Sequence, residues 1–244
     1  MKILIPAAGG GRRFAEAGYT FPKPLLDVRG KPMIQRVVEN LDFPDAEYIF
    51  LVQQEHIEKW NIDKALMQLG KHVSIIPVDG ITEGAACTAL LAKEVINNDE
   101  ELIIANSDQL LDFSRENFDT MREWTPSAGI IFVFHGVHPK WSFARLDSCG
   151  AVCEVAEKRP ISNVATCGVY YYRFGYLFVE AAENMIRLDD RTNGEYYIAP
   201  AYNYIIQRGI RGGGAHHQVL PFFVERMHGL GTPEDLEQYL RHVK

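Results

Sequence analysis

The sequence has no run of hydrophobic residues long enough to span a membrane, and its N-terminus enters strand-like sequence at once without a signal-peptide pattern. A membrane-spanning helix needs about 20 consecutive apolar residues, and a secretory signal peptide combines a charged region with an apolar one. We therefore expect a cytoplasmic protein that does not insert into a membrane. The formal net charge of −7 also argues against a nucleic-acid partner, because proteins that bind nucleic acids present a basic surface.

Cysteine is scarce, and the four that occur have no CxxC spacing: Cys87, Cys149, Cys153 and Cys167. We expect four reduced thiols that fill small apolar spaces. A metal site formed by Cys149, Cys153 and a histidine is the less favoured alternative.

Several catalytic motifs are missing as well. The phosphate loop of ATPases and GTPases requires Gly, four residues and Gly-Lys-Ser/Thr, and no such run is present. The dinucleotide-binding fingerprint fails because Phe14 stands where a third small residue is needed. No Gly-x-Ser-x-Gly motif or Ser-His-acid arrangement indicates a covalent intermediate.

What the sequence does contain is a glycine-rich turn directly after an apolar run at residues 3–5. Gly9, Gly10 and Gly11 allow the backbone N–H groups to approach a ligand closely, and the next residues add positive charge. Ten residues after Arg13, two prolines stiffen the backbone around Lys23. These residues together predict a cradle for phosphate groups.

The remaining pattern alternates between strand and helix. Strands are expected at residues 48–52, 73–78, 102–108 and 128–134, a hairpin at 143–146 and 151–155, and helices at 34–41, 56–69, 84–95 and 174–185. Alternation of this kind predicts parallel strands covered by helices. We expect one domain over residues 1–244, an α/β fold with three α/β/α layers and a mixed, mostly parallel Rossmann-like sheet.

The order Gly-x-Gly-x-Arg, Pro22-Lys23-Pro24 and Gly30-Lys31-Pro32 resembles the N-terminal signature of the sugar-phosphate nucleotidyltransferases. The resemblance implies a nucleotidyltransferase of glycosyltransferase-A-like fold. Such enzymes transfer a nucleoside monophosphate from a nucleoside triphosphate to a phosphorylated acceptor and release pyrophosphate. It also implies a possible homodimer. Arg13 and Lys23 would then contact the triphosphate.

The same resemblance implies a set of nucleotide-binding residues: Ala7, Ala8, Gly9, Gly10, Gly11, Gly84 and Thr88. Gly84 opens an expected helix of small residues that would lie against the base. Tight packing of this helix on the sheet is an equally open interpretation.

Asp108 ends an expected buried strand, where the family has an aspartate that binds Mg²⁺. A carboxylate at the tip of a central strand is suited to that ion, although capping of a helix is the alternative. Asp112 is a possible cap for a helix beginning near Ser114. Arg13, Lys23 and Asp108 are thus the expected catalytic residues, and Mg²⁺ is the expected cofactor.

The acceptor side is expected in the second half of the chain. Glu157 and Lys158 match a Glu-Lys-Pro-like element of the family that contacts the acceptor, although a solvated charge cluster is the alternative. Gly168 belongs to the family strand that follows. The tyrosines 196, 197, 202 and 204 are interpreted as core or interface residues rather than ligand contacts.

The final segment departs from the family pattern. Gly229 stands where many members have an aspartate that is the second Mg²⁺ ligand. Asp235 is interpreted as a charge in the first turn of the last helix, which Thr232 should cap. His228 is a candidate for contact with the metal or the acceptor, and His216 and His217 are interpreted as surface or core residues.

The donor base and the acceptor cannot be read from these motifs. Within the family, a CTP-dependent cytidylyltransferase for a capsule precursor is one variant, including one that acts on a non-sugar phosphate such as phosphoglutamine. A different class is a catalytically inactive nucleotide-binding domain with a regulatory role, for which Gly229 is the supporting feature.

Overall fold

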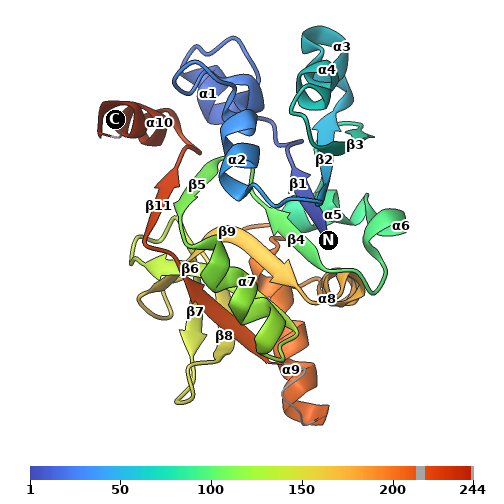
Figure 1. The fold of residues 1–244 in the computed structure, drawn as a ribbon, viewed down its shortest axis with the longest axis vertical. Coiled ribbons are helices and arrows are strands. Elements are labelled where there is room, and N and C mark those ends of the chain that lie inside the picture. Colours follow the sequence, from blue (N-terminus) through green and yellow to red (C-terminus); the bar gives the residue numbers. More distant parts are fainter. Residues whose placement is uncertain (213–217, 243–244) are drawn as a thin grey trace.

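The computed structural model describes residues 1–212 and 218–242, which form a mixed sheet covered by helices (Figure 1). The strands are β1 Lys2–Pro6, β2 Glu47–Gln53, β3 His72–Val78, β4 Leu102–Ala105, β5 Gln109–Asp112, β6 Gly129–His135, β7 Ser142–Leu146, β8 Val152–Glu157, β9 Val164–Tyr172, β10 Val219–Phe223 and β11 Arg226–Gly229. The α-helices are α1 Arg12–Glu16, α2 Met33–Leu41, α3 Gln54–Trp60, α4 Ile62–Met67, α5 Ala85–Leu90, α6 Lys93–Ile96, α7 Arg115–Trp124, α8 Gly175–Arg187, α9 Tyr202–Gly212 and α10 Pro233–His242. Two short 3₁₀ turns complete the described elements, η1 Lys23–Leu25 and η2 Ala199–Ala201.

The main sheet has the strand order β10-β6-β9-β4-β1-β2-β3. Strands β1, β2, β3 and β4 pair in parallel, and so do β6 and β10. Strand β9 runs antiparallel between β4 and β6, and the β7–β8 hairpin joins the sheet beside it. Strands β5 and β11 form a separate antiparallel pair. The expected mixed, mostly parallel α/β fold is therefore confirmed.

Alternating side chains of the strands build two cores, one on each face of the sheet. Leu4 of β1 belongs to a core that includes apolar residues of α5, α8 and α9. Its neighbours Ile3 and Ile5 belong to the other core, with residues of α2, α4 and α7. Successive residues of a strand point to opposite faces, so the buried strands are apolar at nearly every position and helices cover both faces.

Two of the expected helices are divided. The helix expected at residues 56–69 breaks at Asn61, whose φ of 49° is left-handed, so that α3 ends and α4 begins there. Asparagine tolerates this conformation better than most residues. The helix expected at 84–95 ends at Leu90 and resumes at Lys93.

Of the two helix caps expected from the sequence, Thr232 is confirmed and Asp112 is not. The Ser114 side chain accepts a hydrogen bond from the Asn117 N–H and caps α7. Asp112 lies in β5 and does not cap this helix, so that interpretation was wrong. At the start of α10, the Thr232 hydroxyl accepts from the Asp235 N–H at 3.2 Å.

The cysteines are all free, as expected, but they are not all buried. Cys167 is buried in β9, whereas Cys149 is exposed in the hairpin turn between β7 and β8, so it does not fill an apolar space. His216 and His217 lie outside the described residues. None of the described helices has the length and apolar character that crossing a membrane requires.

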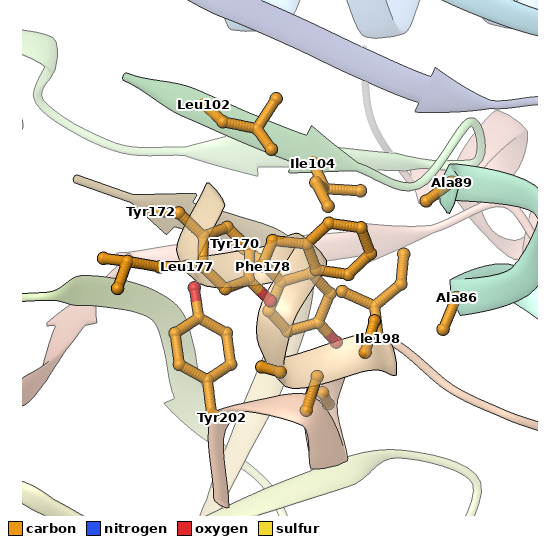
Figure 2. Close-up of a cluster of buried hydrophobic side chains, with 14 of the residues drawn as sticks. Ala86, Ala89, Leu102, Ile104, Tyr170, Tyr172, Leu177, Phe178, Ile198 and Tyr202 are labelled. Carbon is orange, nitrogen blue, oxygen red and sulfur yellow. The ribbon is translucent and has the colours of Figure 1, made fainter. Parts of the chain in front are cut away.

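Aromatic side chains of β9 and α9 pack against each other in the core that contains Leu4 (Figure 2). The ring of Tyr202 stacks on that of Tyr172, with 4.6 Å between centroids. Its hydroxyl donates to the Tyr171 carbonyl oxygen at 2.8 Å. Gly129 leaves room for this ring, because a Cβ there would lie 2.7 Å from Tyr202 Cε1. Tyr202 therefore buries its apolar ring while its hydroxyl keeps a hydrogen-bond partner.

Replacing Tyr202 should destabilise the fold in two separable steps. Tyr202→Phe removes only the buried hydrogen bond, so we expect a loss of about 1 kcal/mol in the free energy of unfolding. Tyr202→Ala also removes the packed ring and should cost about 3 kcal/mol or more. Urea unfolding measures both values, with Tyr176→Phe as the control at a less buried ring. Equal stability of Tyr202→Ala and the wild type would contradict this role.

Candidate functional site

A cleft of about 650 Å³ opens where β1 and β4 end, at the carboxyl ends of parallel strands. In sheets of this type the crevice at these strand ends is the usual place for a ligand. The residues that line the cleft come from both halves of the chain: Pro6, Arg13, Lys23, Ala85, Asn106, Ser107, Asp108, Lys140, Ser142, Glu157, Lys158, Tyr170, Tyr197, Ile198 and Ala199.

The glycine-rich loop begins directly after Pro6 and is anchored at both ends. The Ala7 N–H donates to the Leu51 carbonyl at 2.8 Å, and buried Gln53 donates from Nε2 to the Ala8 carbonyl at 2.8 Å. Gly11 has a φ of 57° and starts α1, and a Cβ there would lie 3.8 Å from the Lys23 Cβ. The loop therefore turns sharply beside the backbone of Lys23.

The two adjacent arginines of this loop have different surroundings. Arg13 lines the cleft. Arg12 points its guanidinium to Glu16, at 2.7 Å on the exposed side of α1. Phe14 is buried and packs edge-on against Tyr19. The residue that rules out a dinucleotide fingerprint is thus a core residue that fixes α1, and Arg13 is the arginine of this pair that faces the ligand space.

Lys23 and Asp108 form the central ion pair of the cleft. Lys23 Nζ lies 2.7 Å from Asp108 Oδ2, and both side chains are mostly buried. The pair connects residues that are 85 positions apart. Behind Asp108, the Leu230 N–H donates to its carbonyl oxygen at 2.8 Å, and Gly231 is close enough that a Cβ would lie 2.8 Å from Oδ2.

Glu157 and Lys158 occupy the opposite wall. The Ser142 hydroxyl donates to Glu157 Oε2, and burial raises the pKa of the Glu157 carboxyl above its usual value. Lys158 follows the end of β8 with a left-handed φ of 52°, which is uncommon for a side chain that is not glycine. Its ammonium contacts the Tyr197 hydroxyl and lies 4.5 Å from the centroid of that ring.

Other residues expected at the site are near the cleft in sequence but are not among the residues that line it. The glycine loop from Ala7 to Gly11 adjoins Pro6, and Gly84 and Thr88 belong to the start of α5, next to Ala85. The Thr88 hydroxyl is 2.6 Å from that of Thr82. Gly84 packs so tightly on the backbone of Tyr196 that a Cβ would lie 2.4 Å from its carbonyl oxygen. Their contact with a base stays a prediction.

Gly168 lies in β9 with a φ of 70°, beside the segment that carries the central acid. Its carbonyl oxygen accepts from the Asn106 N–H at 2.8 Å. A Cβ at this position would lie 1.9 Å from Gln109 Oε1 and 2.4 Å from Asn106 Nδ2. Gly168 therefore allows β9 to approach the turn that presents Asp108, and its contact with an acceptor stays a prediction.

Sequence reasoning missed part of the wall. Lys140, Ser142, Tyr170 and Tyr197 all line the cleft, and Tyr197 had been interpreted as a core or interface residue. A partial signal was present, because Ser142 lies at the start of the expected hairpin and therefore faces the end of the partner strand, where Glu157 stands. Nothing local indicated that Lys140 or Tyr197 would reach the same space.

The final segment also differs from expectation in one detail. His228 lies 3.3 Å from Asp112 and lines a second cavity of about 340 Å³, rather than the main cleft. Asp235 is in the first turn of α10, as expected, and its carboxylate points toward Gly229, since a Cβ there would lie 3.8 Å from Asp235 Oδ2.

The side chains of the cleft that could bind a metal fit a cation that is held mainly by a bound ligand rather than by the protein. Asp108 supplies one partly exposed carboxylate to the cleft, and the described residues contain no cluster of three or more His, Cys, Asp or Glu side chains suited to a metal. Mg²⁺ is commonly held by one or two carboxylates together with phosphate oxygens and water. One carboxylate beside a phosphate cradle is consistent with that mode.

A family model described as nucleotidyl transferase matches residues 2–209, which is most of the chain. The chain belongs to the nucleotidyl transferase family. The resemblance expected from residues 3–32 is thereby confirmed.

Curated nucleotidyl transferases and related proteins share modest identity with the chain. The bifunctional protein GlmU of Methanocaldococcus jannaschii is 25% identical over 228 residues, which are 90% of this chain and 51% of that protein. The UTP–glucose-1-phosphate uridylyltransferase of Staphylococcus haemolyticus is 42% identical over 55 residues, 22% of this chain and 19% of that enzyme. The chain spans about half the length of this archaeal protein, whereas the match covers most of the chain itself.

Solved structures show the same fold over nearly the full chain. The nucleoside-diphosphate-sugar pyrophosphorylase of Vibrio cholerae RC9 superposes with a TM-score of 0.80 at 25% identity, covering 99% of this chain and 100% of that one. The inositol-1-phosphate CTP transferase of T. maritima gives a TM-score of 0.73 at 12% identity, with coverage of 99% and 96%. This second likeness concerns the fold alone.

The raised pKa of Glu157 predicts how stability changes with pH. A glutamate titrates near pH 4.3 in the unfolded chain, and burial keeps the folded form protonated to a higher pH. As pH rises from about 4 to about 8, the unfolded chain loses its proton first, so the wild type should lose stability relative to Glu157→Gln. Urea unfolding across this range measures the difference.

Glu154 on the same strand is the matched control, because its hydrogen bond from Arg145 lowers its pKa. Glu154→Gln should be less stable than the wild type at about pH 8, and this difference should shrink as the pH falls below the usual pKa of a glutamate and through the lowered pKa of folded Glu154. The same pH trend for both variants would contradict the assignment of burial as the cause at Glu157.

Proposed function

We propose that this protein transfers a nucleoside monophosphate from a nucleoside triphosphate to a phosphorylated small molecule, with release of pyrophosphate. The observation that carries the proposal is that one cleft brings together the five charged residues that the sequence indicated for the site: Arg13, Lys23, Asp108, Glu157 and Lys158. They come from segments far apart in the sequence. Membership of the nucleotidyl transferase family supports the same reaction class.

The reaction needs orientation and neutralised charge more than it needs a protein nucleophile. The acceptor phosphate oxygen attacks the α-phosphorus of the triphosphate, a new P–O bond forms, and the bond to the β-phosphate oxygen breaks as pyrophosphate departs. Arg13 and Lys23 adjoin the glycine loop, so we assign them to the triphosphate and the leaving pyrophosphate. Their fixed positive charge stabilises the charge that develops in the transition state.

The acceptor is assigned to the opposite wall. Lys158 supplies a cation for the acceptor phosphate, and its position is set by Tyr197 and by the left-handed backbone at the end of β8. Glu157, when ionised, accepts hydrogen bonds from hydroxyl groups, and the hydroxyl of Ser142 already shows that geometry. A hydroxyl-bearing acceptor, such as a sugar phosphate, satisfies both residues.

We assign Mg²⁺ to Asp108 as its protein ligand. When bound, the ion would neutralise charge on the triphosphate and orient it. Lys23 would then exchange its contact with Asp108 for a phosphate oxygen, because the ion and the Lys23 ammonium would both need the Asp108 carboxylate. A cytidylyltransferase is one case of this proposed reaction. The nucleoside triphosphate that the enzyme accepts decides whether this case applies.

The reaction is tested by measuring pyrophosphate release with Mg²⁺ and each of ATP, CTP, GTP, UTP and dTTP, crossed with pools of sugar phosphates and non-sugar phosphates that include phosphoglutamine. Release confined to one donor and one pool is the expected result. Triphosphate binding without release in any pool would instead favour an inactive regulatory domain, and absence of binding would overturn the proposal.

Lys23→Ala should lower turnover about a hundredfold or more, as loss of a preorganised charge contact does. Lys59→Ala is the control, since Lys59 pairs with Glu55 on an exposed helix surface and does not line the cleft. Circular dichroism and urea unfolding establish that both variants fold. Wild-type turnover in a folded Lys23→Ala enzyme would remove Lys23 from the mechanism.

A further inference from the structure

Lys140 is a cation of the main cleft to which neither the family motifs nor the proposed reaction gives a role. It immediately precedes Trp141 and β7, on the wall that carries the acceptor residues. The Lys158 N–H donates to the Trp141 carbonyl at 3.0 Å, and Ser142 bonds Glu157. The backbone that carries Lys140 is therefore attached directly to the two residues assigned to the acceptor.

The ammonium of Lys140 is positioned by two groups from different elements. Nζ lies 2.8 Å from Oδ1 of Asp235, in the first turn of α10, and 4.5 Å from the centroid of the Trp141 ring. The Asp235 side chain is mostly buried, whereas Lys140 is about two-fifths exposed. A half-exposed ion pair adds little to stability, so its main effect is to fix where the ammonium lies.

Gly229 makes this arrangement possible. A Cβ at residue 229 would lie 3.2 Å from the Trp141 ring and 3.8 Å from Asp235, so any larger side chain would crowd the two groups that hold Lys140. Two residues later, Gly231 adjoins Asp108 in the same way. The short segment 229–231 thus has one lysine–aspartate pair at each end, Lys23 with Asp108 and Lys140 with Asp235.

We propose that Lys140 binds the phosphate of the acceptor and that Asp235 is a positioning residue that holds its ammonium at the cleft wall. The inference rests on the proposed function and adds a second acceptor cation beside Lys158. A lysine has three N–H donors, so the ammonium can keep its bond to Asp235 while it donates to a phosphate oxygen. Lys140 borders the second cavity as well as the cleft, which leaves its side chain room to reach that oxygen.

The test separates binding of the acceptor from binding of the donor. Lys140→Met removes the charge and keeps an unbranched side chain, and it should raise KM for the acceptor about tenfold or more, as loss of a charged hydrogen bond does. KM for the triphosphate should change less than about twofold, because the donor lies with Arg13 and Lys23. Lys140→Arg should recover part of the acceptor affinity, since the charge is restored.

Asp235→Asn tests the positioning role. Asp235→Asn alone should raise KM for the acceptor by a few-fold. In a Lys140→Met background it should have no further effect, because Asp235 acts on the acceptor only through the Lys140 ammonium. Lys93→Met is the control, since Lys93 is about as exposed as Lys140, pairs with Glu183 and does not line the cleft. Additive effects of Asp235→Asn and Lys140→Met would overturn the positioning role.

Failure of the inference is distinguishable from failure of the proposed function. If the wild type releases pyrophosphate and Lys140→Met leaves acceptor KM unchanged, the role of Lys140 is wrong and the reaction stands. If the wild type releases none with any acceptor, titration with inorganic phosphate decides: weaker binding by Lys140→Met supports the cation site, and equal binding overturns it. Absence of both turnover and phosphate binding would overturn both proposals.

Discussion

The contact between Lys23 and Asp108 is the constraint on which the cleft depends, because it joins η1, beside the glycine-rich loop, to the turn that follows β4. An ion pair that is removed from most of the solvent loses hydration, and either charge alone would be strongly destabilising there. The ion pair therefore fixes the two side chains relative to each other. A polyanion with its counter-cation offers both residues new partners of the right sign, so the pair suits the cleft to such a ligand.

The topology explains why the two walls of the cleft face each other. Strand β1 ends at the cleft with Pro6, and Asn106 of the cleft wall directly follows the end of β4. Strand β9 is antiparallel to both β4 and β6. Strand β7 pairs with β9 at Phe143 and Ala165, and its partner β8 ends with Glu157 on the opposite wall. One antiparallel strand, β9, thus connects the two halves of the chain within the sheet.

The sequence predicted the α/β fold and the two walls because their signals are local. A buried run followed by three glycines, or a strand that ends in an acid, identifies both the element and its end. The breaks at Asn61 and after Leu90 were missed, since they depend on how short helices pack on the sheet. Lys140, Ser142 and Tyr197 were missed for a related reason, because only the pairing of β7 with β8 and the packing of the segment between α8 and η2 bring them to the cleft.

The tight approach of Gly84 to Tyr196 connects the two halves of the site through backbone alone. Tyr196 donates its N–H to the Glu83 carbonyl and accepts from the Ala86 N–H, while the next residue, Tyr197, contacts Lys158. These hydrogen bonds link the start of α5 to the residue before Tyr197, so the two segments are fixed relative to each other through the main chain. The absence of a side chain at Gly84 is what allows the two backbones to come this close.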